Sequence, residues 1–351
     1  MIEIWRAGGV EFTASLAEAR TVEAAGWDGQ IFMDSQSLCA DPYARMGVWA
    51  AGTERIKLAT GVTNPLTRHP VVTAASAAGV QAISGGRAVL GIGRGDSALA
   101  YLGHAPVRLS AFRRSLEDLQ TLLSGGEVDF SRFAPTGDAP SLDSMSLAGQ
   151  PMGSALRWLP NDLPKVPLDV AASGPKVIEM AATIAERVTF SVGANPARVR
   201  WAIDLAREAR RKAGLNEHGI NLGLVVIVVC HPDIDAMREL ATAFVTPLAR
   251  YQVMQGDAVG PQSESDRANF QVIQRSYDMN KHGEMHAGDS GLAWDFVQRF
   301  AIVGPPEHCV ERLQDLVRLG IERFMVVGPD LMQPGPTLFT QEVIPALREA
   351  A

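Results

Sequence analysis

Cysteine, long apolar runs and excess positive charge are all scarce in this chain. Its three cysteines, Cys39, Cys230 and Cys309, lie far apart and lack the spacing of a metal site or a disulfide framework. The longest apolar run, residues 222–230, is about half as long as a membrane-spanning helix must be. The first residues lack the basic segment and apolar stretch of a signal peptide. These absences predict a cytoplasmic protein that does not span a membrane.

The balance of charge argues against nucleic acid as a partner. The chain carries 32 basic and 39 acidic residues, for a formal net charge of −7. Proteins that coat nucleic acid are usually basic, whereas a local site on an acidic surface can still bind an anion. We therefore expect a small-molecule substrate and neither a nucleic-acid nor a membrane partner.

Short apolar runs alternate with longer amphipathic segments along most of the 351 residues. Regular alternation of this kind predicts parallel strands joined by right-handed crossovers. Eight of the runs, several rich in valine and isoleucine, have the composition of strands buried on both faces. These are residues 2–7, 30–34, 56–63, 88–92, 167–172, 187–192, 222–230 and 324–327. The fold class predicted is α/β, an eight-stranded parallel TIM barrel, with an open doubly wound sheet as the alternative.

Start and stop signals define four of the helical segments. A helix over 11–25 ends before Gly26, and a helix over 71–83 ends before Gly85. The segment 196–212 follows Asn195, which is suited to cap the first turn, and 307–319 ends before Gly320.

Two stretches interrupt the rhythm, at about residues 125–165 and 255–290. Both are longer than ordinary connections, so they are predicted to be insertions within a single domain that spans residues 1–351. Either they cover a site, or they are surface excursions that only enlarge the barrel.

In a barrel of this kind, functional residues follow the carboxyl ends of the strands. Asp34 and Ser35 end one apolar run, and a carboxylate there can bind a ligand, act as an acid or base, cap a helix or form an ion pair. Gly61 lies inside another extended run, where glycine indicates a bulge or a close backbone approach. His69 follows in the same stretch, and its simplest interpretation is a satisfied polar group at a helix start.

The stretch at 172–176 has the properties of a phosphate site. Ser173 and Gly174 stand between a predicted strand and a helix that begins at Pro175. Free amides at a helix start attract anions, and the Ser173 hydroxyl and the Lys176 ammonium add a donor and a charge. The alternative is an ordinary strand-to-helix turn. The position after the fifth strand also differs from the usual phosphate site of such barrels, which follows the last two strands.

The glycines at 91–95 do not fit a dinucleotide motif. The sixth position of the pattern is Asp96, and no acidic residue ends a strand about 20 positions later. Glycines that let the backbone lie against a flat ring are a better interpretation, and a glycine-rich barrel corner is the other one.

Metal and hydrolase chemistry have little support in the sequence. His282 and His286 are four residues apart, but Gly283 weakens a helix there and the pattern is not that of a zinc protease. A loop is the better interpretation, and no metal is expected. The chain also lacks a nucleophile elbow and a P-loop.

Four longer stretches together resemble the bacterial luciferase-like oxidoreductase superfamily, and within it the deazaflavin-dependent branch of the methylene-tetrahydromethanopterin reductases. They are EAAGWD at 23–28, TGVTNPLTRHP at 60–70, GGRAVLGIGRGDSALAYLG at 85–103 and AASGPK at 171–176. The resemblance implies a barrel that binds a reduced flavin or deazaflavin at the carboxyl ends of its strands. It also implies a cis peptide between Gly61 and Val62.

The resemblance also assigns residues to the coenzyme. The ring would lie against the third strand end, so that a side chain at Gly61 would collide with it, and Asp34 would face the polar edge of the ring or the substrate. The ribityl chain and the phosphate would be bound by the later strand ends. The residues assigned to the coenzyme are Thr60, Gly61, Val62, Thr63, Asn64, Gly93, Gly95, Asp96, Ser97, Ser173, Gly174, Pro175 and Lys176.

Two positions depart from this resemblance. Sugar-phosphate dehydrogenases of the deazaflavin branch have a histidine and a glutamate where this chain has Ser35 and Arg94, so a sugar phosphate is not expected as the substrate. The archaeal reductases have proline at the place of Arg94. That arginine could bind an anion, or it could be a surface arginine paired with Asp96. We take Asp34, Ser35 and Arg94 as the candidate catalytic residues.

The leading hypothesis is an oxidoreductase that transfers a hydride between reduced deazaflavin, coenzyme F-420, and a small organic substrate. The first alternative is a monooxygenase that uses flavin mononucleotide (FMN) and oxygen, and the second is a flavin-binding barrel without catalytic activity. The resemblance further implies a homodimer formed through the helices that flank the second and third strands.

Overall fold

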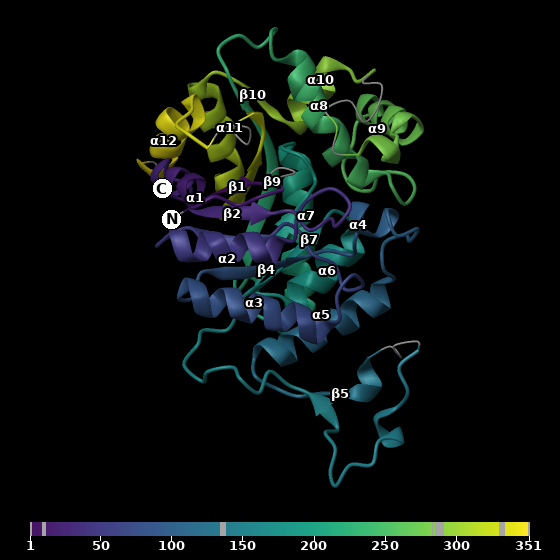
Figure 1. Ribbon diagram of the computed structural model, residues 1–351. Coiled ribbons are helices and arrows are strands. Elements are labelled where there is room, and N and C mark those ends of the chain that lie inside the picture. The colour runs from purple at the N-terminus through teal and green to yellow at the C-terminus, as the bar shows by residue number, and fades with distance from the viewer. Residues whose placement is uncertain are drawn as a thin grey trace.

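Eight parallel strands close into a barrel that is surrounded by helices (Figure 1). The structure is a computed structural model and describes residues 2–8, 12–133, 138–282, 284, 291–329 and 334–349. The barrel strands are β1 (Glu3–Ala7), β2 (Gly29–Phe32), β3 (Lys57–Thr60), β4 (Ala88–Ile92), β7 (Leu168–Ala172), β8 (Arg187–Phe190), β9 (Asn221–Cys230) and β11 (Arg323–Val327). Each pairs in parallel with the next, and β11 pairs with both β9 and β1, which closes the cylinder. The predicted TIM barrel is confirmed, and the open sheet is wrong.

The alternation of side chains along each strand divides the apolar residues into two cores. Trp5, Ile31, Ala59, Val89 and Met325 point into the barrel and form a small inner cluster. A much larger cluster lies between the strands and the surrounding helices. Since both faces of every strand are covered, the strands are apolar along nearly their whole length, which is the pattern that the sequence shows.

The surrounding helices are α1 (Leu16–Ala24), α2 (Pro42–Gly52), α3 (Pro70–Ser84), α4 (Ser97–Ala100), α5 (Leu109–Leu123), α6 (Pro175–Ile184), α7 (Pro196–Lys212), α11 (Pro306–Leu319) and α12 (Ile344–Glu349). Of the four helices predicted with both bounds, α3, α7 and α11 lie within one residue of the prediction, whereas the first helix begins at Leu16, behind its N-cap Ser15, five residues later than predicted. Asn195 caps α7 by accepting a hydrogen bond from the amide of Ala197 at 2.9 Å. Gly85 and Gly320 end α3 and α11 at φ values of 64° and 114°, which an L side chain rarely adopts. Glu11, the predicted start of α1, lies outside the described residues.

Charged residues occupy the amino-terminal floor of the barrel, where four strands begin. Glu3 accepts hydrogen bonds from Lys57 and Arg187, each at 2.5 Å. Burial raises the pKa of Glu3, but attraction to these two cations outweighs it and lowers the pKa to about 2. Arg323, which is fully buried, forms a second ion pair with Asp169 at 2.8 Å. The floor is therefore held by paired charges and the remaining interior by apolar packing.

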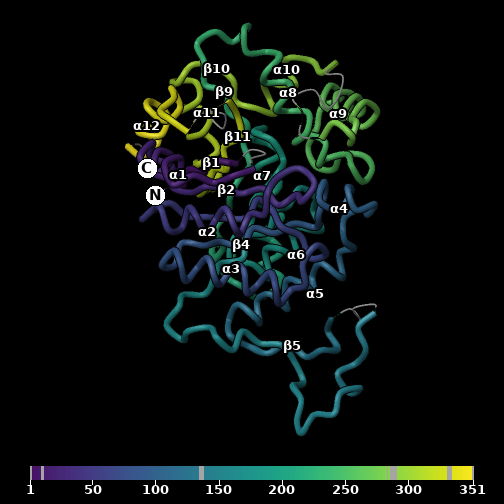
Figure 2. The backbone as a smooth tube through the Cα atoms, viewed as in Figure 1, coloured from purple at the N-terminus to yellow at the C-terminus, as the bar shows by residue number. Residues whose placement is uncertain are grey.

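The first insertion forms an arm on the flank of the barrel (Figure 2). It leaves after α5 and returns before β7, and its short strands β5 (Val128–Asp129) and β6 (Gly153–Ser154) pair with each other. The described part of the arm packs on α5 through Arg132, whose Nε donates to Asp118 at 2.6 Å, and touches the start of α3 where Phe133 meets the ring of His69. The described part of the arm lies on the flank of the barrel, against α5 and the start of α3. A covering role for this insertion stays a prediction. Within the predicted range, residues 134–137 are not described.

The second insertion is part of a longer excursion between β9 and β11. It contains α8 (Arg238–Ala249), α9 (Glu264–Ser276), α10 (Trp294–Phe300) and the strand β10 (Ile302–Gly304). The sequence did not predict β10, which pairs with the carboxyl-terminal part of β9 beyond the barrel proper. The helices form a separate small core with β9. The prediction at 255–290 covers only the middle of this excursion, and residues 283 and 285–290 are not described.

Among the helices that the structure describes, none is long and apolar enough to cross a membrane.

Candidate active site

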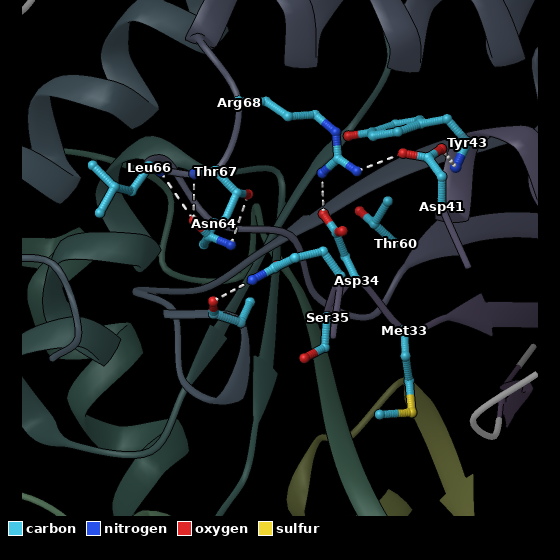
Figure 3. Close-up of polar contacts among 12 residues, drawn as sticks. Met33, Asp34, Ser35, Asp41, Tyr43, Thr60, Asn64, Leu66, Thr67 and Arg68 are labelled. Carbon is cyan, nitrogen blue, oxygen red and sulfur yellow. Dashed lines mark hydrogen bonds and ion pairs between the residues drawn. The ribbon is translucent and has the colours of Figure 1, made fainter. Parts of the chain in front are cut away.

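Asp34, which follows β2, is buried and paired with an arginine (Figure 3). Arg68 lies between two carboxylates, with Nη1 2.5 Å from Asp34 Oδ2 and Nη2 2.6 Å from Asp41 Oδ2. Its guanidinium also lies 5.3 Å from the centre of the Tyr43 ring. Burial lowers the pKa of Arg68, but the two carboxylates outweigh it and raise the pKa above its ordinary value. The sequence left open whether Asp34 binds a ligand, acts as an acid or base, caps a helix or forms an ion pair. The structure contains the ion pair.

The ends of β2 and β4 are tied together by hydroxyl groups. Ser35 Oγ lies 3.0 Å from Ser97 Oγ, and the Gln36 amide donates to the carbonyl of Ala98 at 2.7 Å. The predicted catalytic Ser35 and the predicted coenzyme ligand Ser97 are therefore direct neighbours. This contact joins two strand ends that are 62 residues apart in the chain.

The end of β3 contains the cis peptide between Gly61 and Val62 that the resemblance implied. The side chains around it bind the protein's own backbone. Thr60 Oγ1 donates to the carbonyl of Gly91 at 2.7 Å, and Asn64 Oδ1 accepts from the amides of residues 66 and 67 at 3.0 Å. Thr63 is completely buried, and its hydroxyl has no hydrogen-bond partner within the described ranges.

Gly61 is required by packing inside the barrel. A Cβ at this position would lie 1.6 Å from Cγ2 of Ile31. Within the protein, a side chain here would collide with Ile31. The collision with the ring of a coenzyme that the resemblance implies stays a prediction. Gly91 is similar, because its Cβ would lie 1.9 Å from the carbonyl oxygen of Thr60. Both glycines let neighbouring strands approach closely, which is the close backbone approach predicted for Gly61.

Arg94 holds two loops in place. Its Nε donates to the carbonyl of Val107 at 2.7 Å, and its Nη1 donates to Oε1 of Gln255 at 2.9 Å. Its partner is therefore the second insertion and not Asp96, so the interpretation as a surface arginine paired with Asp96 is wrong. The neighbouring Gly95 has a φ of 89°, which turns the chain toward α4. Gly93 fits tightly, with Val62 Cγ2 3.0 Å from the place of a Cβ.

Asp96 forms an ion pair with Arg250, which precedes the predicted second insertion. Burial lowers the pKa of Arg250, but the charge of Asp96 outweighs it and raises the pKa. The guanidinium lies 5.2 Å and 4.7 Å from the ring centres of Tyr251 and Tyr277. The hydroxyl of Tyr277 forms a hydrogen bond with Nδ1 of His282. Together these groups cover the end of β4, so the second insertion lies over the mouth as a cover would.

The start of α6 is open. Gly174 precedes this helix without any side-chain cap, and a Cβ at Gly174 would meet no atom within 4 Å. Ser173 Oγ makes a weak contact with the carbonyl of Tyr251 at 3.5 Å, and Lys176 is exposed. By contrast, α3 begins with a capped turn, because His69 Nδ1 accepts from the amide of Val71 at 3.3 Å. His69 is thus the satisfied polar group that its position indicates.

Sequence reasoning missed the residues that pair with the mouth carboxylates. Arg68 was inside a recognised stretch but was not singled out, and Arg250 lies outside every motif. One signal was available, because the chain has only four tyrosines. Three of them lie near these carboxylates: Tyr43 is close to Asp34, and Tyr251 and Tyr277 are close to Asp96. Tyr101 is close to Tyr277.

Two cavities lie away from these residues. One of about 290 Å³ is lined by residues of the second insertion, including Ala258, Arg267 and Phe270. The other, of about 480 Å³, lies at the base of the arm beside Leu123 and Lys165. Among the described residues, no group of three or more potential metal ligands is present. His286, named above with His282, lies outside the described residues.

Comparison with known proteins places this geometry in a family. The model of the luciferase-like monooxygenase family matches residues 4–323. The chain is 28% identical over 335 residues to the 5,10-methylenetetrahydromethanopterin reductase of Methanopyrus kandleri, with 88% of each chain covered. It is 26% identical over 315 residues to the F420-dependent glucose-6-phosphate dehydrogenase of Microbacterium testaceum, covering 87% of this chain and 82% of that protein.

Solved structures share the fold at lower sequence identity. The coenzyme F420 dependent tetrahydromethanopterin reductase from Methanopyrus kandleri superposes with a TM-score of 0.72 at 21% identity, with 99% of each chain covered. The EDTA monooxygenase of Chelativorans sp. BNC1 superposes with a TM-score of 0.66 at 13% identity, covering 100% of this chain and 94% of the other. The same barrel therefore occurs in proteins named for deazaflavin chemistry and in proteins named for oxygen chemistry.

Proposed function

Because the chain belongs to the luciferase-like monooxygenase family, a family of oxidoreductases, we propose that it transfers a hydride between coenzyme F-420 and a small organic substrate. The observation that carries this proposal is the similarity to an F420-dependent glucose-6-phosphate dehydrogenase over 87% of the chain. We place the reaction at the carboxyl-terminal mouth, where the ends of β2, β3, β4 and β7 meet.

The residues at the mouth fit a phosphorylated coenzyme. The uncapped start of α6, the open approach at Gly174 and the exposed Lys176 supply free amides, space and a positive charge for a phosphate. The buried hydroxyls of Thr63 and Tyr43 lie beside each other at the end of β3 and form a polar spot below the place that we propose for the ring. For the other residues that the resemblance assigns to the coenzyme, contact with it stays a prediction.

When bound, the deazaflavin ring supplies a carbon that gives or accepts a hydride. The chain provides the surroundings. Arg68 balances the charge of Asp34 across a 2.5 Å ion pair, and this carboxylate would orient a ligand by accepting a hydrogen bond. The second insertion, anchored by Arg94 and Arg250, keeps bulk water away from the mouth. Ser35 and Ser97 hold the ends of β2 and β4 at a fixed separation.

The substrate differs from that of the dehydrogenase relatives. The positions where the sugar-phosphate enzymes have a histidine and a glutamate are Ser35 and Arg94, and both are occupied by contacts within the protein. We therefore do not propose a sugar phosphate as the substrate.

An FMN-dependent monooxygenase is the second candidate, favoured by the likeness of the fold to the EDTA monooxygenase. Titration of the protein with F-420 and with FMN, followed by fluorescence, tests both. We expect F-420 to bind with a dissociation constant below about 100 μM, which corresponds to about 5.5 kcal/mol, and turnover to consume no oxygen. Preferential binding of FMN with oxygen consumption would support the second candidate. Binding of neither would contradict both and leave a barrel without this activity.

We also propose that the protein acts in the cytoplasm as a homodimer formed through α2 and α3. Exposed apolar side chains on these helices support the dimer: Val48 is 37% exposed, Val72 51% and Ile83 59%. Replacing Val72 and Ile83 with lysine should give a monomer in light scattering. A dimer that survives this double substitution would contradict the proposed interface.

A further inference from the structure

The second insertion contains a cavity of about 290 Å³ that the proposed function does not use. One wall is a face of α9, which lies at the edge of the molecule (Figure 1) and lines the cavity with Arg267, Phe270, Gln271 and Gln274, three and four residues apart. The other wall comes from the chain before α9, within residues 253–262. This volume is near the lower end of the range for ligand sites, so it suits a small organic molecule.

Arg198, on α7, holds the wall before α9 in place. Its guanidinium donates to the carbonyls of Val259 and Pro261 at 3.1 and 2.9 Å, and to Oε1 of Gln252 at 2.6 Å. The same guanidinium lies 5.5 Å from the centre of the Phe270 ring, which belongs to the wall on α9. Because one buried side chain contacts both walls, the cavity is a preformed feature of the fold.

Polar groups without a partner line this cavity. Within the described ranges, the side chains of Arg267 and Asp257 form neither an ion pair nor a hydrogen bond. The amide of Gln262 donates through Nε2 to the carbonyl of Ala258 at 2.7 Å, while its buried Oε1 has no hydrogen-bond partner among the described residues. Since buried polar atoms are nearly always paired, this oxygen indicates a missing donor. The cavity therefore offers a cation, an anion and a buried acceptor to a ligand.

The charges of the lining restrict the class of ligand. A molecule with only a negative charge would be attracted by Arg267 and repelled by Asp257, and a molecule with only a positive charge would meet the reverse. The remaining lining is apolar, because Val253, Ala258 and Phe270 are buried side chains of the walls. A molecule with both charges and an apolar part satisfies all of these groups.

We propose that this cavity binds a small zwitterion with an apolar part, such as a free apolar amino acid, and that its occupation stabilises the segment over the mouth. Arg267 binds the carboxylate, Asp257 and Oε1 of Gln262 accept hydrogen bonds from the ammonium group, and Phe270 contacts the apolar part. This inference goes beyond the proposed function and does not depend on which coenzyme the barrel binds.

The cavity and the mouth share one stretch of chain after α8. In this stretch Arg250 pairs with Asp96, and Gln255 accepts a hydrogen bond from Nη1 of Arg94 at 2.9 Å. Val253 lies between these two contacts and lines the cavity, and its amide donates to the carbonyl of Arg250 at 2.9 Å. A ligand in the cavity therefore restrains the same residues that attach this stretch to the end of β4.

Calorimetric titration of the full chain with L-leucine, L-methionine and L-phenylalanine tests the site. We expect at least one of them to bind with a dissociation constant below about 1 mM. Two analogues of leucine each lack one charge: 4-methylpentanoate has no ammonium group, and 3-methylbutylamine has no carboxylate. Each should bind about tenfold more weakly than leucine or worse, because a charge-assisted hydrogen bond is lost.

Substitutions at exposed positions identify the groups that bind. Arg267→Gln and Asp257→Asn should each weaken amino-acid binding by about 10- to 100-fold. Asp257→Asn should also strengthen the binding of 4-methylpentanoate, since the repulsion of its carboxylate is removed. Gln271→Trp should fill the cavity and abolish binding. Arg275→Gln and Glu264→Gln, at exposed positions of α9 outside the lining, are the matched controls and should leave binding unchanged.

Hydrogen exchange tests the link to the mouth without any coenzyme. A saturating amino acid should slow exchange by about fivefold or more at residues 250–258 and also at residues 94–107, and neither effect should occur in Gln271→Trp. Failure of all three amino acids to bind below about 1 mM would overturn the site, as would equal affinity for leucine and both analogues. Binding without slower exchange at residues 94–107 would overturn the effect on the mouth. Because no measurement includes F-420, these outcomes are separate from the success or failure of the proposed function.

Discussion

Arg250 and Asp96 form an ion pair that joins the end of α8, just before the second insertion, to the end of β4 across 154 residues of sequence. The arginine side chain is 8% exposed and stacks on two tyrosines, so this contact is almost closed to solvent. The segment that lies over the mouth is therefore attached to the end of β4 by an ion pair as well as by apolar packing.

We expect this pair to couple strongly in a double-mutant cycle. Asp96→Asn or Arg250→Gln alone leaves the other charge buried, which should lower the free energy of unfolding by about 3–5 kcal/mol. In the double variant, the loss of unfolding free energy should be smaller than the sum of the two single losses by about 1–3 kcal/mol. Denaturant unfolding measures the coupling, and hydrogen exchange should increase at residues 250–282 in either single variant. The exposed pair of Arg211 and Glu208 is the control, with coupling below about 1 kcal/mol. Equal coupling in both pairs would contradict the anchoring role.

Lys176 is predicted to contact the phosphate of the coenzyme. Lys176→Ala should weaken F-420 binding by about 1–3 kcal/mol, because a charge-assisted hydrogen bond is lost. Binding of a phosphate-free analogue should not change, which fluorescence titration of both molecules can establish. Lys212→Ala, at an exposed lysine at the end of α7, should affect neither. Equal losses of binding free energy for the two molecules would show that the phosphate does not bind at Lys176.

Gly61 is predicted to be a packing residue. Gly61→Ala should lower the free energy of unfolding by about 1–3 kcal/mol, because the added Cβ overlaps Ile31. Ile31→Ala should relieve part of this loss in the double variant. Gly79→Ala, in α3 with no atom within 4 Å of the added Cβ, should be neutral or stabilise by up to about 1 kcal/mol. A fully stable Gly61→Ala would show that β2 and β3 are not in such close contact.

The ion pairs of Glu3 at the floor of the barrel should make the free energy of unfolding depend on pH in the acid range. The pKa of Glu3 is about 2 in the folded protein and 4.5 ordinarily, so its contribution is complete above about pH 4.5 and is lost as the pH falls toward 2. Allowing for partial exposure, Glu3→Gln should cost about 1–2 kcal/mol at pH 7 and less at pH 3. Urea unfolding at the two values of pH measures the difference. The same cost at both would exclude a charge effect.

Most of the fold was predictable because strands and helices that are buried have apolar residues at regular positions in the sequence. All eight predicted runs overlap the eight barrel strands, and α7 has the predicted bounds because Pro196 and Asn195 specify its start. The strand β10 was missed, since three residues are too short to show a period. The arm at 125–165 was recognised as an insertion, but its place on the flank depends on contacts with α5 that no local pattern encodes.

The sequence by itself determined that this chain forms a barrel and which residues stand at the carboxyl ends of its strands, because apolar periodicity and glycine positions are local properties of the chain. Only the tertiary structure decided which charges meet there. Arg68 neutralises Asp34, Arg250 neutralises Asp96, and Arg94 binds Gln255 instead of a carboxylate. Such pairs join residues up to 161 positions apart, and their formation depends on how the polar insertions fold over the mouth.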